Sequence, residues 1–405
     1  MTSRIMPSSR ARTALATTLA TTLATTLTVG LAAGLLAPSA TAAGPDRDRD
    51  RGHGGGHGHG HRTSPEVIAH RGASGYRPEH TLAAYELAIA QGVDMIEPDL
   101  VSTKDGVLVA RHENEISGTT DVADHPEFAD RRTTKVIDGV EYTGWFTEDF
   151  TLAELRTLRA KERLPEVRPD NTAYDGQFEI PTLEEIIVFA AEQSEATGRE
   201  IGIAPETKHP TYFDEIGLSL EEPLVELLDE HDLDDRRDPV VLQSFEVGNL
   251  QELDELTDVR LAQLMDASGA PYDLVAAGSD VTYDDLLTRH GLRWVSRYAD
   301  YVAPHKDRVL PRDEATGATG RPSSVVRDAH RAGLEVVIWT LRAENQFMAT
   351  NFRVGTDPNA NGDMAAESEA FLDAGVDVLF ADHPDIAVEV RDAWVDDRRP
   401  RHGGR

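Results

Sequence analysis

The strongest constraint on the fold is a regular alternation, from Val67 onward, of short apolar runs with longer amphipathic stretches. The amphipathic stretches include residues 81–92, 182–198, 221–232 and 322–333, and several of them close on glycine, which commonly ends helices. The apolar runs are VIAHRG, MIEPDL, VLVARHE, IGIAPETK, VVLQSF, RLAQLM, YADYVAP, EVVIWTL and VDVLFADHP. Strands alternating with helices predict a parallel α/β sheet covered by helices. The length and the number of units favour a closed (β/α)8 TIM barrel over an open doubly wound sheet.

The nine apolar runs exceed the strands of such a barrel by one. We expect the surplus at VLVARHE, because the Asp105-Gly106 turn before it leaves no room for a crossover helix. This run is therefore predicted to fold back as a hairpin arm. The segment from about Asn114 to Phe178 then interrupts the rhythm with short mixed elements. We interpret 114–178 as an insertion that caps one end of a barrel domain covering residues 64–395.

The two ends of the chain have a different composition. Three arginines precede a long uncharged stretch that closes on Ala40-Thr41-Ala42, and this pattern predicts a secretory signal peptide over residues 1–42. A membrane anchor is the alternative, which the many threonines and the small-residue end disfavour. Residues 43–63 are rich in Gly and His and are interpreted as a disordered tether, although their histidines could bind a transition metal weakly. Residues 396–405 are predicted to be a flexible tail.

No run after the tether is long enough to span a bilayer, so we expect a secreted, extracellular protein without a membrane span after cleavage. The chain has no cysteine, so an apolar core must stabilise it without disulfides. Its formal net charge of −32 argues against nucleic acid as a partner, because phosphate backbones bind basic surfaces. Any phosphate that this protein handles must therefore meet a few local cations or a metal.

Ionisable residues stand at the carboxyl ends of four consecutive apolar runs. They are His70 and Arg71, then Glu97 and Asp99, then His112, then Glu206 and Lys208. In a (β/α)8 barrel the carboxyl ends of the strands form one rim, and this rim carries the active site. Because residues i and i+2 of a strand point to the same side, each i, i+2 pair projects together. We predict that all of these side chains belong to one site.

The carboxylates at this rim, Glu97, Asp99 and Glu206, form an oxygen-only set. Such a set suits Ca²⁺ or Mg²⁺ rather than Zn²⁺. Without a cation the three acids would repel one another, and burial would raise the pKa of at least one of them. The alternative is that each acid makes a separate salt bridge at the rim.

The histidines of the rim suggest acid–base chemistry on a phosphate ester. One of His70 and His112 can accept a proton while the other donates one, the usual division of labour in phosphodiester cleavage without a protein nucleophile. The Arg71 guanidinium suits bidentate contact with phosphate, and Lys208 would also offset its charge. Three residues that end later runs are candidates for the substrate mouth, with packing as the alternative: Gln243, Phe245 and Trp339.

The stretch HRGASGYRPEHTLAAYELAIAQGVDMIEPDLVSTKDGVLVARHE resembles the core motif of the glycerophosphodiester phosphodiesterase family, in its secreted or periplasmic branch. The likeness continues through APETKHP, LQSF, LAQLM, WTLRAEN and FLDAGVDVLFADHPD. It implies a (β/α)8 barrel and Ca²⁺-dependent hydrolysis of glycerophosphodiesters to sn-glycerol 3-phosphate and an alcohol. It further implies that His70 and His112 are the general acid/base pair, and that Arg71 and Lys208 lie at the phosphate. The metal ligands it implies are Glu97, Asp99 and Glu206.

Two other functions compete with this expectation. With the same chemistry, the substrate could be a glycerol-phosphate teichoic acid trimmed from one end. The chain could also be a Ca²⁺-binding surface protein without turnover, although the presence of both histidines argues against that alternative.

Overall fold

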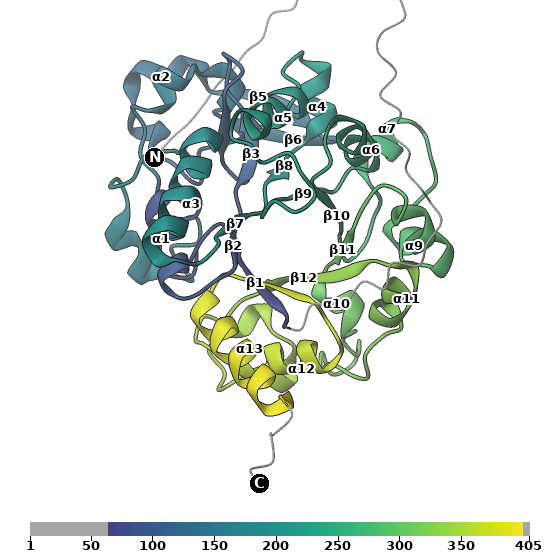
Figure 1. The fold of residues 1–405 in the computed structure, drawn as a ribbon. Helices are drawn as coiled ribbons and strands as arrows, with labels where there is room; N and C mark the ends of the chain where they lie inside the picture. Colours follow the sequence, from purple (N-terminus) through teal and green to yellow (C-terminus); the bar gives the residue numbers. More distant parts are fainter. Residues whose placement is uncertain (1–63, 400–405) are drawn as a thin grey trace, which may run out of the picture. The chain divides into compact units, whose positions relative to one another are not determined.

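The computed structural model of the chain describes residues 64–399, which Figure 1 draws in colour. The predicted signal peptide and tether, 1–42 and 43–63, lie outside the described residues, as do residues 400–405 of the predicted tail. Helix α13 (Pro384–Arg398) continues past Val395, where we placed the end of the barrel domain. Within residues 64–399, no helix combines the length and the apolar character that crossing a membrane requires.

The described residues form a barrel of parallel strands, and Figure 1 looks along its axis. The strands are β1 (Glu66–Ala69), β2 (Met95–Ile96), β3 (Asp99–Ser102), β7 (Gly202–Ile203), β8 (Glu206–Thr207), β9 (Val241–Ser244), β10 (Arg260–Met265), β11 (Tyr301–Pro304), β12 (Glu335–Leu341) and β13 (Val378–Ala381). Strand β1 pairs in parallel with both β13 and β2. Parallel pairing continues from β2 to β7, from β3 to β8, and then from β8 through β13 in chain order. This pairing closes the sheet into the predicted (β/α)8 barrel.

Two of the eight strand positions are interrupted by proline. Pro98 separates β2 from β3, and Pro205 separates β7 from β8. A proline has no N–H to donate to the ladder, so the strand breaks at that residue. The ladder resumes at once beyond each break, where Asp99 pairs in register with Glu206. The interruptions therefore lie at the carboxyl rim, beside the predicted site residues.

The surplus apolar run has the predicted hairpin structure. Strand β4 (Leu108–Ala110) pairs antiparallel with β3, and Gly106 adopts a left-handed φ of 79° in the turn between them. The segment that follows contains a separate two-stranded sheet, β5 (Thr133–Ile137) with β6 (Val140–Gly144). It also contains α2 (Leu152–Leu155), η1 (Val122–Asp124), η2 (Pro126–Arg131), η3 (Thr147–Asp149) and η4 (Pro169–Tyr174).

Helices surround the barrel, and α3 (Leu183–Thr197) ends where its sequence predicts. In α3 the N-cap Thr182 and Glu185 form a reciprocal capping box, and the helix ends at the left-handed Gly198. The other α-helices are α1 (Leu82–Ala90), α4 (Pro210–Glu215), α5 (Glu221–Glu230), α6 (Val247–Leu256), α7 (Tyr272–Ala276), α8 (Tyr283–Leu286), α9 (Arg289–Val295), α10 (Lys306–Val309), α11 (Val325–Ala332) and α12 (Met364–Asp373). The loop after β12 contains η5 (Asn345–Phe347) and η6 (Thr350–Phe352).

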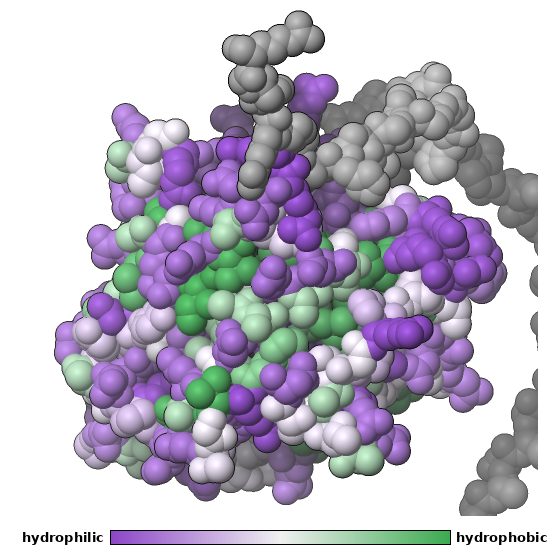
Figure 2. Space-filling view, turned by 90° about the horizontal axis from the view of Figure 1, so that it is seen from below, coloured by the Kyte–Doolittle hydropathy of each residue, from purple (hydrophilic) through white to green (hydrophobic). Residues whose placement is uncertain are grey.

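The apolar core has two parts, which together replace the disulfides that the chain lacks. A large cluster lies between the sheet and the helices, and a smaller one, including Ile68, Leu264 and Phe380, comes from the strands and from Ala204 between β7 and β8. Each fully buried side chain of this size contributes roughly 1.5–3 kcal/mol. Figure 2 views the molecule from below Figure 1, the side of α12 and α13, and hydrophobic residues gather in the middle of that face between hydrophilic margins.

Candidate active site

The predicted carboxylates meet at the rim of the barrel. Glu97 directly follows β2, Asp99 begins β3 and Glu206 begins β8, and all three are buried. One oxygen from each lies within 4.8 Å of the others. The in-register pairing of Asp99 with Glu206 explains this proximity, since registered neighbours in a parallel sheet point to the same side. The prediction that two strands bring these acids together is confirmed.

The electrostatics of this acidic triad fit a divalent cation. Burial and the neighbouring Asp99 raise the pKa of Glu97 well above its usual range, and burial raises the pKa of Glu206 to about 8. Burial also opposes ionisation of Asp99, yet Lys208 and Arg71 hold its pKa well below its usual range. Asp99 Oδ1 forms no hydrogen bond with any residue that the structure describes. The three carboxylates offer only oxygen atoms and repel one another when ionised. A bound Ca²⁺ or Mg²⁺ would offset that repulsion.

The two predicted phosphate-binding cations flank the triad. Arg71 Nε lies 3.2 Å from Asp99 Oδ2, and the Arg71 backbone N–H donates to Glu97 Oε2 at 2.6 Å. The left-handed φ of 60° at Arg71 turns the chain so that both contacts form. Lys208 Nζ lies 2.6 Å from Glu206 Oε1 and 3.6 Å from Asp99 Oδ1. Positive charge is therefore concentrated beside the carboxylates, in a protein whose net charge is strongly negative.

His70 is held by a carboxylate that sequence reasoning missed. Its Nδ1 lies 2.5 Å from Asp382 Oδ1, and both side chains are buried. Burial and Arg71 lower the pKa of His70 to about 3, so the imidazole is neutral near pH 7. With the Nδ1 proton donated to Asp382, Nε2 is the nitrogen left to accept a proton. Asp382 directly follows the apolar run of β13, so the rule used for the first four runs would have found it in the last.

His112 has a similar carboxylate partner. Its Nδ1 lies 3.0 Å from Glu113 Oε1, and about a quarter of its side chain (26%) is exposed. Burial, Arg71 and Lys208 lower the pKa of His112 to about 3. The Arg71 charge contributes to the lowered pKa of both imidazoles.

A third histidine, His80, was also missed by sequence reasoning. It is fully buried, and its Nε2 lies 2.9 Å from Asp99 Oδ2 while its Nδ1 lies 3.0 Å from the Tyr85 hydroxyl. His80 therefore orients one of the three carboxylates. It stands in the loop before α1 rather than after an apolar run, so the strand-end rule gave no signal for it.

The three candidates for the substrate mouth occupy different environments. Phe245 packs edge-on against Trp339, with ring centroids 5.5 Å apart, and Lys208 Nζ lies 5.8 Å from the centre of the Phe245 ring. These two rings therefore form an apolar wall beside a cation of the rim. Gln243 is buried and donates from Nε2 to the Ala204 carbonyl at 2.8 Å, a contact between neighbouring strands.

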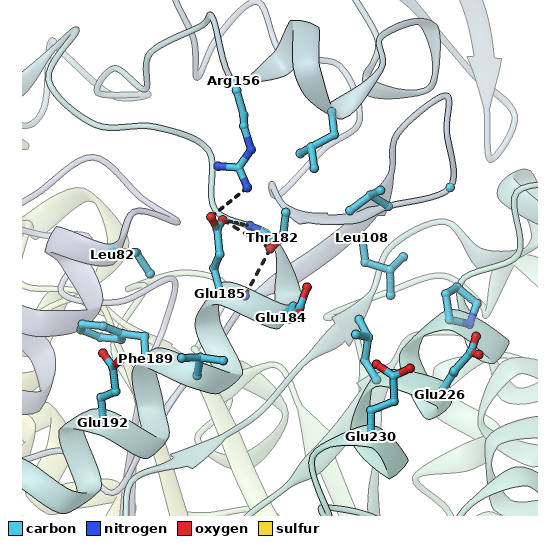
Figure 3. A pocket seen from close by; sticks show the side chains of 16 residues that line it. Leu82, Leu108, Arg156, Thr182, Glu184, Glu185, Phe189, Glu192, Glu226 and Glu230 are labelled. Carbon is cyan, nitrogen blue, oxygen red and sulfur yellow. Dashed lines mark hydrogen bonds and ion pairs between the residues drawn. The ribbon is translucent and has the colours of Figure 1, made fainter.

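Two cavities lie outside the acidic triad. One, of about 810 Å³, is a groove on the flank of the barrel that is lined by apolar side chains and by several glutamates. It includes none of the predicted site residues. Figure 3 shows Arg156 of this groove pointing to Glu185, while Glu226 and Glu230 stand on the opposite side. The other cavity, of about 540 Å³, is lined by the buried Arg168 and Glu344 and so lies on the side of Asp382.

Taken together, the fold and the rim define a barrel enzyme suited to an anionic ester. Three carboxylates, two neutral imidazoles and two cations converge where barrel enzymes carry their active sites. This arrangement is that of a phosphoric diester hydrolase.

Comparison with known proteins identifies the family. The profile of the glycerophosphoryl diester phosphodiesterase family matches residues 70–386, and the chain belongs to this family. A glycerophosphodiester phosphodiesterase of Arabidopsis thaliana is 35% identical over 331 residues, which cover 78% of this chain and 83% of the relative. One from Haemophilus influenzae is 29% identical, and the match covers 80% of this chain and 88% of that relative. The resemblance expected from the sequence motifs is confirmed.

A solved structure supports the fold independently. An Oleispira antarctica phosphodiesterase, in complex with the product sn-glycerol-3-phosphate, superposes with a TM-score of 0.51 at 22% identity. The match covers 81% of this chain and 97% of that one. At this identity the likeness concerns the barrel fold.

Proposed function

We propose that this protein is an exported, metal-dependent phosphodiesterase that hydrolyses glycerophosphodiesters to sn-glycerol 3-phosphate and an alcohol. The observation that carries the proposal is the pair of carboxylate-held imidazoles, His70 with Asp382 and His112 with Glu113, at the rim that bears the acidic triad. Membership of the family supports the reaction class. Export rests on the sequence pattern of residues 1–42.

In this proposal, the two histidines move the protons. One neutral imidazole accepts a proton at Nε2 from the attacking hydroxyl, and the other, once protonated, donates one to the departing alkoxide. The bound phosphodiester is an anion and would raise the pKa of the nearby imidazole, which favours the protonated form needed for donation. Arg71 and Lys208 offset the charge that grows on the phosphate oxygens.

Family resemblance implies that the attacking hydroxyl is the substrate's own glycerol 2-hydroxyl. Its oxygen forms a new bond to phosphorus as the bond to the alcohol oxygen breaks, which gives a cyclic phosphate. Water then opens the ring, with the histidines exchanging their acid and base roles. This sequence of proton transfers needs two imidazoles and no protein nucleophile. The presence of two histidines at the rim agrees with that requirement.

Glu97, Asp99 and Glu206 would hold the metal, with Ca²⁺ as the expected ion and Mg²⁺ as the alternative. When bound, such an ion supplies Lewis-acid stabilisation of negative charge on the phosphate. The hydrogen bond from His80 Nε2 to Asp99 Oδ2 fixes the orientation of one carboxylate, as partners of metal ligands commonly do.

A small glycerophosphodiester is proposed as the substrate ahead of a glycerol-phosphate polymer. The support for this choice is that the similar proteins from Arabidopsis thaliana and Haemophilus influenzae are named as glycerophosphodiester phosphodiesterases.

The experiment that tests the proposal is release of sn-glycerol 3-phosphate from glycerophosphocholine by the purified mature protein. Release should stop with EDTA and return when Ca²⁺ or Mg²⁺ is restored. Full activity in EDTA would overturn the metal assignment. If no diester is cleaved but purified teichoic acid releases glycerol phosphate, the polymer is the substrate. Sequencing the N-terminus of protein from the culture medium tests export, and a start at Ala43 is expected.

A further inference from the structure

The insertion contacts the groups behind both predicted catalytic histidines. It joins β4 to α3 and contributes Arg168 and Asp138, which belong to different parts of it: Arg168 precedes η4, and Asp138 lies in the β5–β6 turn. Neither residue stands at the end of a barrel strand, so the sequence pattern gave no reason to connect either with the rim.

Arg168 completes a chain of contacts that ends at His70. Its Nη2 donates to Asp382 Oδ2 at 2.6 Å, while the other oxygen of Asp382 lies 2.5 Å from His70 Nδ1. Its Nε donates to Glu344 at 2.6 Å, and its Nη1 donates to the Ser74 carbonyl at 3.0 Å. Arg168 is only 6% exposed, so a fixed guanidinium fork clamps the carboxylate that holds the imidazole.

Asp138 completes a second chain that ends at His112. Asp138 Oδ2 lies 2.6 Å from His209 Nδ1, and His209 Nε2 lies 2.9 Å from Glu113 Oε2. The other oxygen of Glu113 is the atom 3.0 Å from His112 Nδ1. Both ring nitrogens of His209 face carboxylates, so the ring donates through both and carries a positive charge between two negative ones.

We propose that Arg168 and Asp138 are positioning residues, through which the insertion fixes the orientation of both catalytic imidazoles. This inference rests on the proposed function, since it concerns the two histidines assigned to acid–base catalysis. A carboxylate bonded to Nδ1 sets the tautomer and the ring angle of a histidine, and its own partners in turn set the position of the carboxylate. The two chains share no residue, so each can be altered without changing a member of the other. Arg342 Nε also donates to Asp382 Oδ2, at 2.9 Å, so an Arg168 variant loses one of the two guanidinium groups on this oxygen.

The first test is a comparison of Arg168→Ala and Arg168→Lys with a matched control in the insertion, Arg131→Ala. Arg131 also pairs with a carboxylate, Glu154, but contacts neither histidine chain. Arg168→Ala is expected to lower kcat by roughly 10–100-fold with little change in KM, as for other partners of site ligands. Arg168→Lys keeps the charge and should recover part of the loss. Arg131→Ala should leave kcat within about twofold.

The second test uses Asp138→Asn, with Asp149→Asn as its control. Asp138 has a left-handed φ of 49°, which asparagine tolerates well, so the turn should keep its shape while the charge is lost. Asp149 pairs with Lys135 in the same insertion and contacts neither chain. A fall in kcat of about tenfold is expected for Asp138→Asn alone.

An observation independent of turnover completes the test. In ¹⁵N-histidine NMR spectra, with His70 assigned from a His70→Gln difference, the parent protein should show one tautomer with the proton on Nδ1. Arg168→Ala should show a mixture of tautomers or fast exchange of that proton. Unchanged His70 signals together with unchanged kcat in Arg168→Ala and Asp138→Asn would overturn the positioning role. A parent protein that cleaves no diester would instead contradict the proposed function, and the NMR comparison would still decide the positioning role.

Discussion

His70 Nδ1 and Asp382 Oδ1 lie 2.5 Å apart, although 312 residues separate them in the chain. Strands β1 and β13 pair in parallel at the closure of the barrel, and each residue follows the end of its strand. The contact between this imidazole and its carboxylate is therefore a consequence of barrel closure.

Asp382→Asn should weaken catalysis more than substrate binding. The amide keeps the size of the side chain, but it can present its NH₂ group to Nδ1 and so favour the wrong tautomer of His70. We expect kcat to fall by roughly 10–100-fold, with KM nearly unchanged. Steady-state kinetics with glycerophosphocholine measure both constants. A large rise in KM at constant kcat would contradict the orienting role.

His70→Ala and His112→Ala should each reduce turnover by about 10²–10⁴-fold, the usual contribution of a general acid or base. The double variant should lose little more than either single variant, because the two groups act in one proton-transfer sequence. Circular dichroism of each variant controls for folding. If either single variant stays within a few-fold of the parent, that histidine is not an acid–base group.

The barrel and the meeting of its rim residues could be predicted because both follow from local patterns. The alternation of runs gives the strand order, and the strand-end rule assembles Glu97, Asp99 and Glu206 without any knowledge of long-range contacts. The Asp105-Gly106 turn likewise predicted the hairpin arm. Each of these inferences needs only a few neighbouring residues and the geometry of a parallel barrel.

The groups behind the rim could not be predicted in this way, because they depend on contacts between distant segments. Arg168 reaches Asp382 across 214 residues, and nothing in the local sequence of the insertion indicates that contact. Asp138 contacts His209 across 71 residues through a turn that looks like any Asp-Gly turn. Prediction from one sequence therefore reached the residues that are expected to touch substrate and missed those that hold them.

Removing one carboxylate of the triad should weaken metal binding but should not lower the thermal stability of the metal-free protein. In EDTA, Glu206→Gln should unfold at a temperature no lower than the parent, because burial first, and then the neighbouring Asp99, disfavour the charged carboxylate that the change removes. With Ca²⁺ present, the parent should gain thermal stability through binding to the folded state, and the variant should gain little. Differential scanning calorimetry measures both effects without an activity assay. Equal Ca²⁺-induced changes in unfolding temperature in parent and variant would exclude Glu206 as a ligand.

The charged His209 should make stability depend on pH in a defined window. Burial lowers its pKa, but the hydrogen bonds to Asp138 and Glu113 outweigh burial and raise the pKa from 6.5 to about 9. Because the pKa of His209 is higher in the folded state, its proton stabilises the folded protein fully at pH values below the unfolded pKa of 6.5. This stabilisation is lost as the pH rises from 6.5 through about 9. The largest contribution is on the order of 3 kcal/mol, because each tenfold gain in proton affinity on folding corresponds to roughly 1.4 kcal/mol.

Urea unfolding of the parent and of His209→Gln at several pH values measures this effect. The difference in unfolding free energy should be largest near about pH 6 and smallest near about pH 10, because only the charged ring gains from both carboxylates. Comparing the two proteins at each pH removes the titration of all other groups, provided that they are unaffected by the substitution. A difference that stays constant over this range would mean that folding does not raise the pKa of His209, and would contradict the charged ring between Asp138 and Glu113.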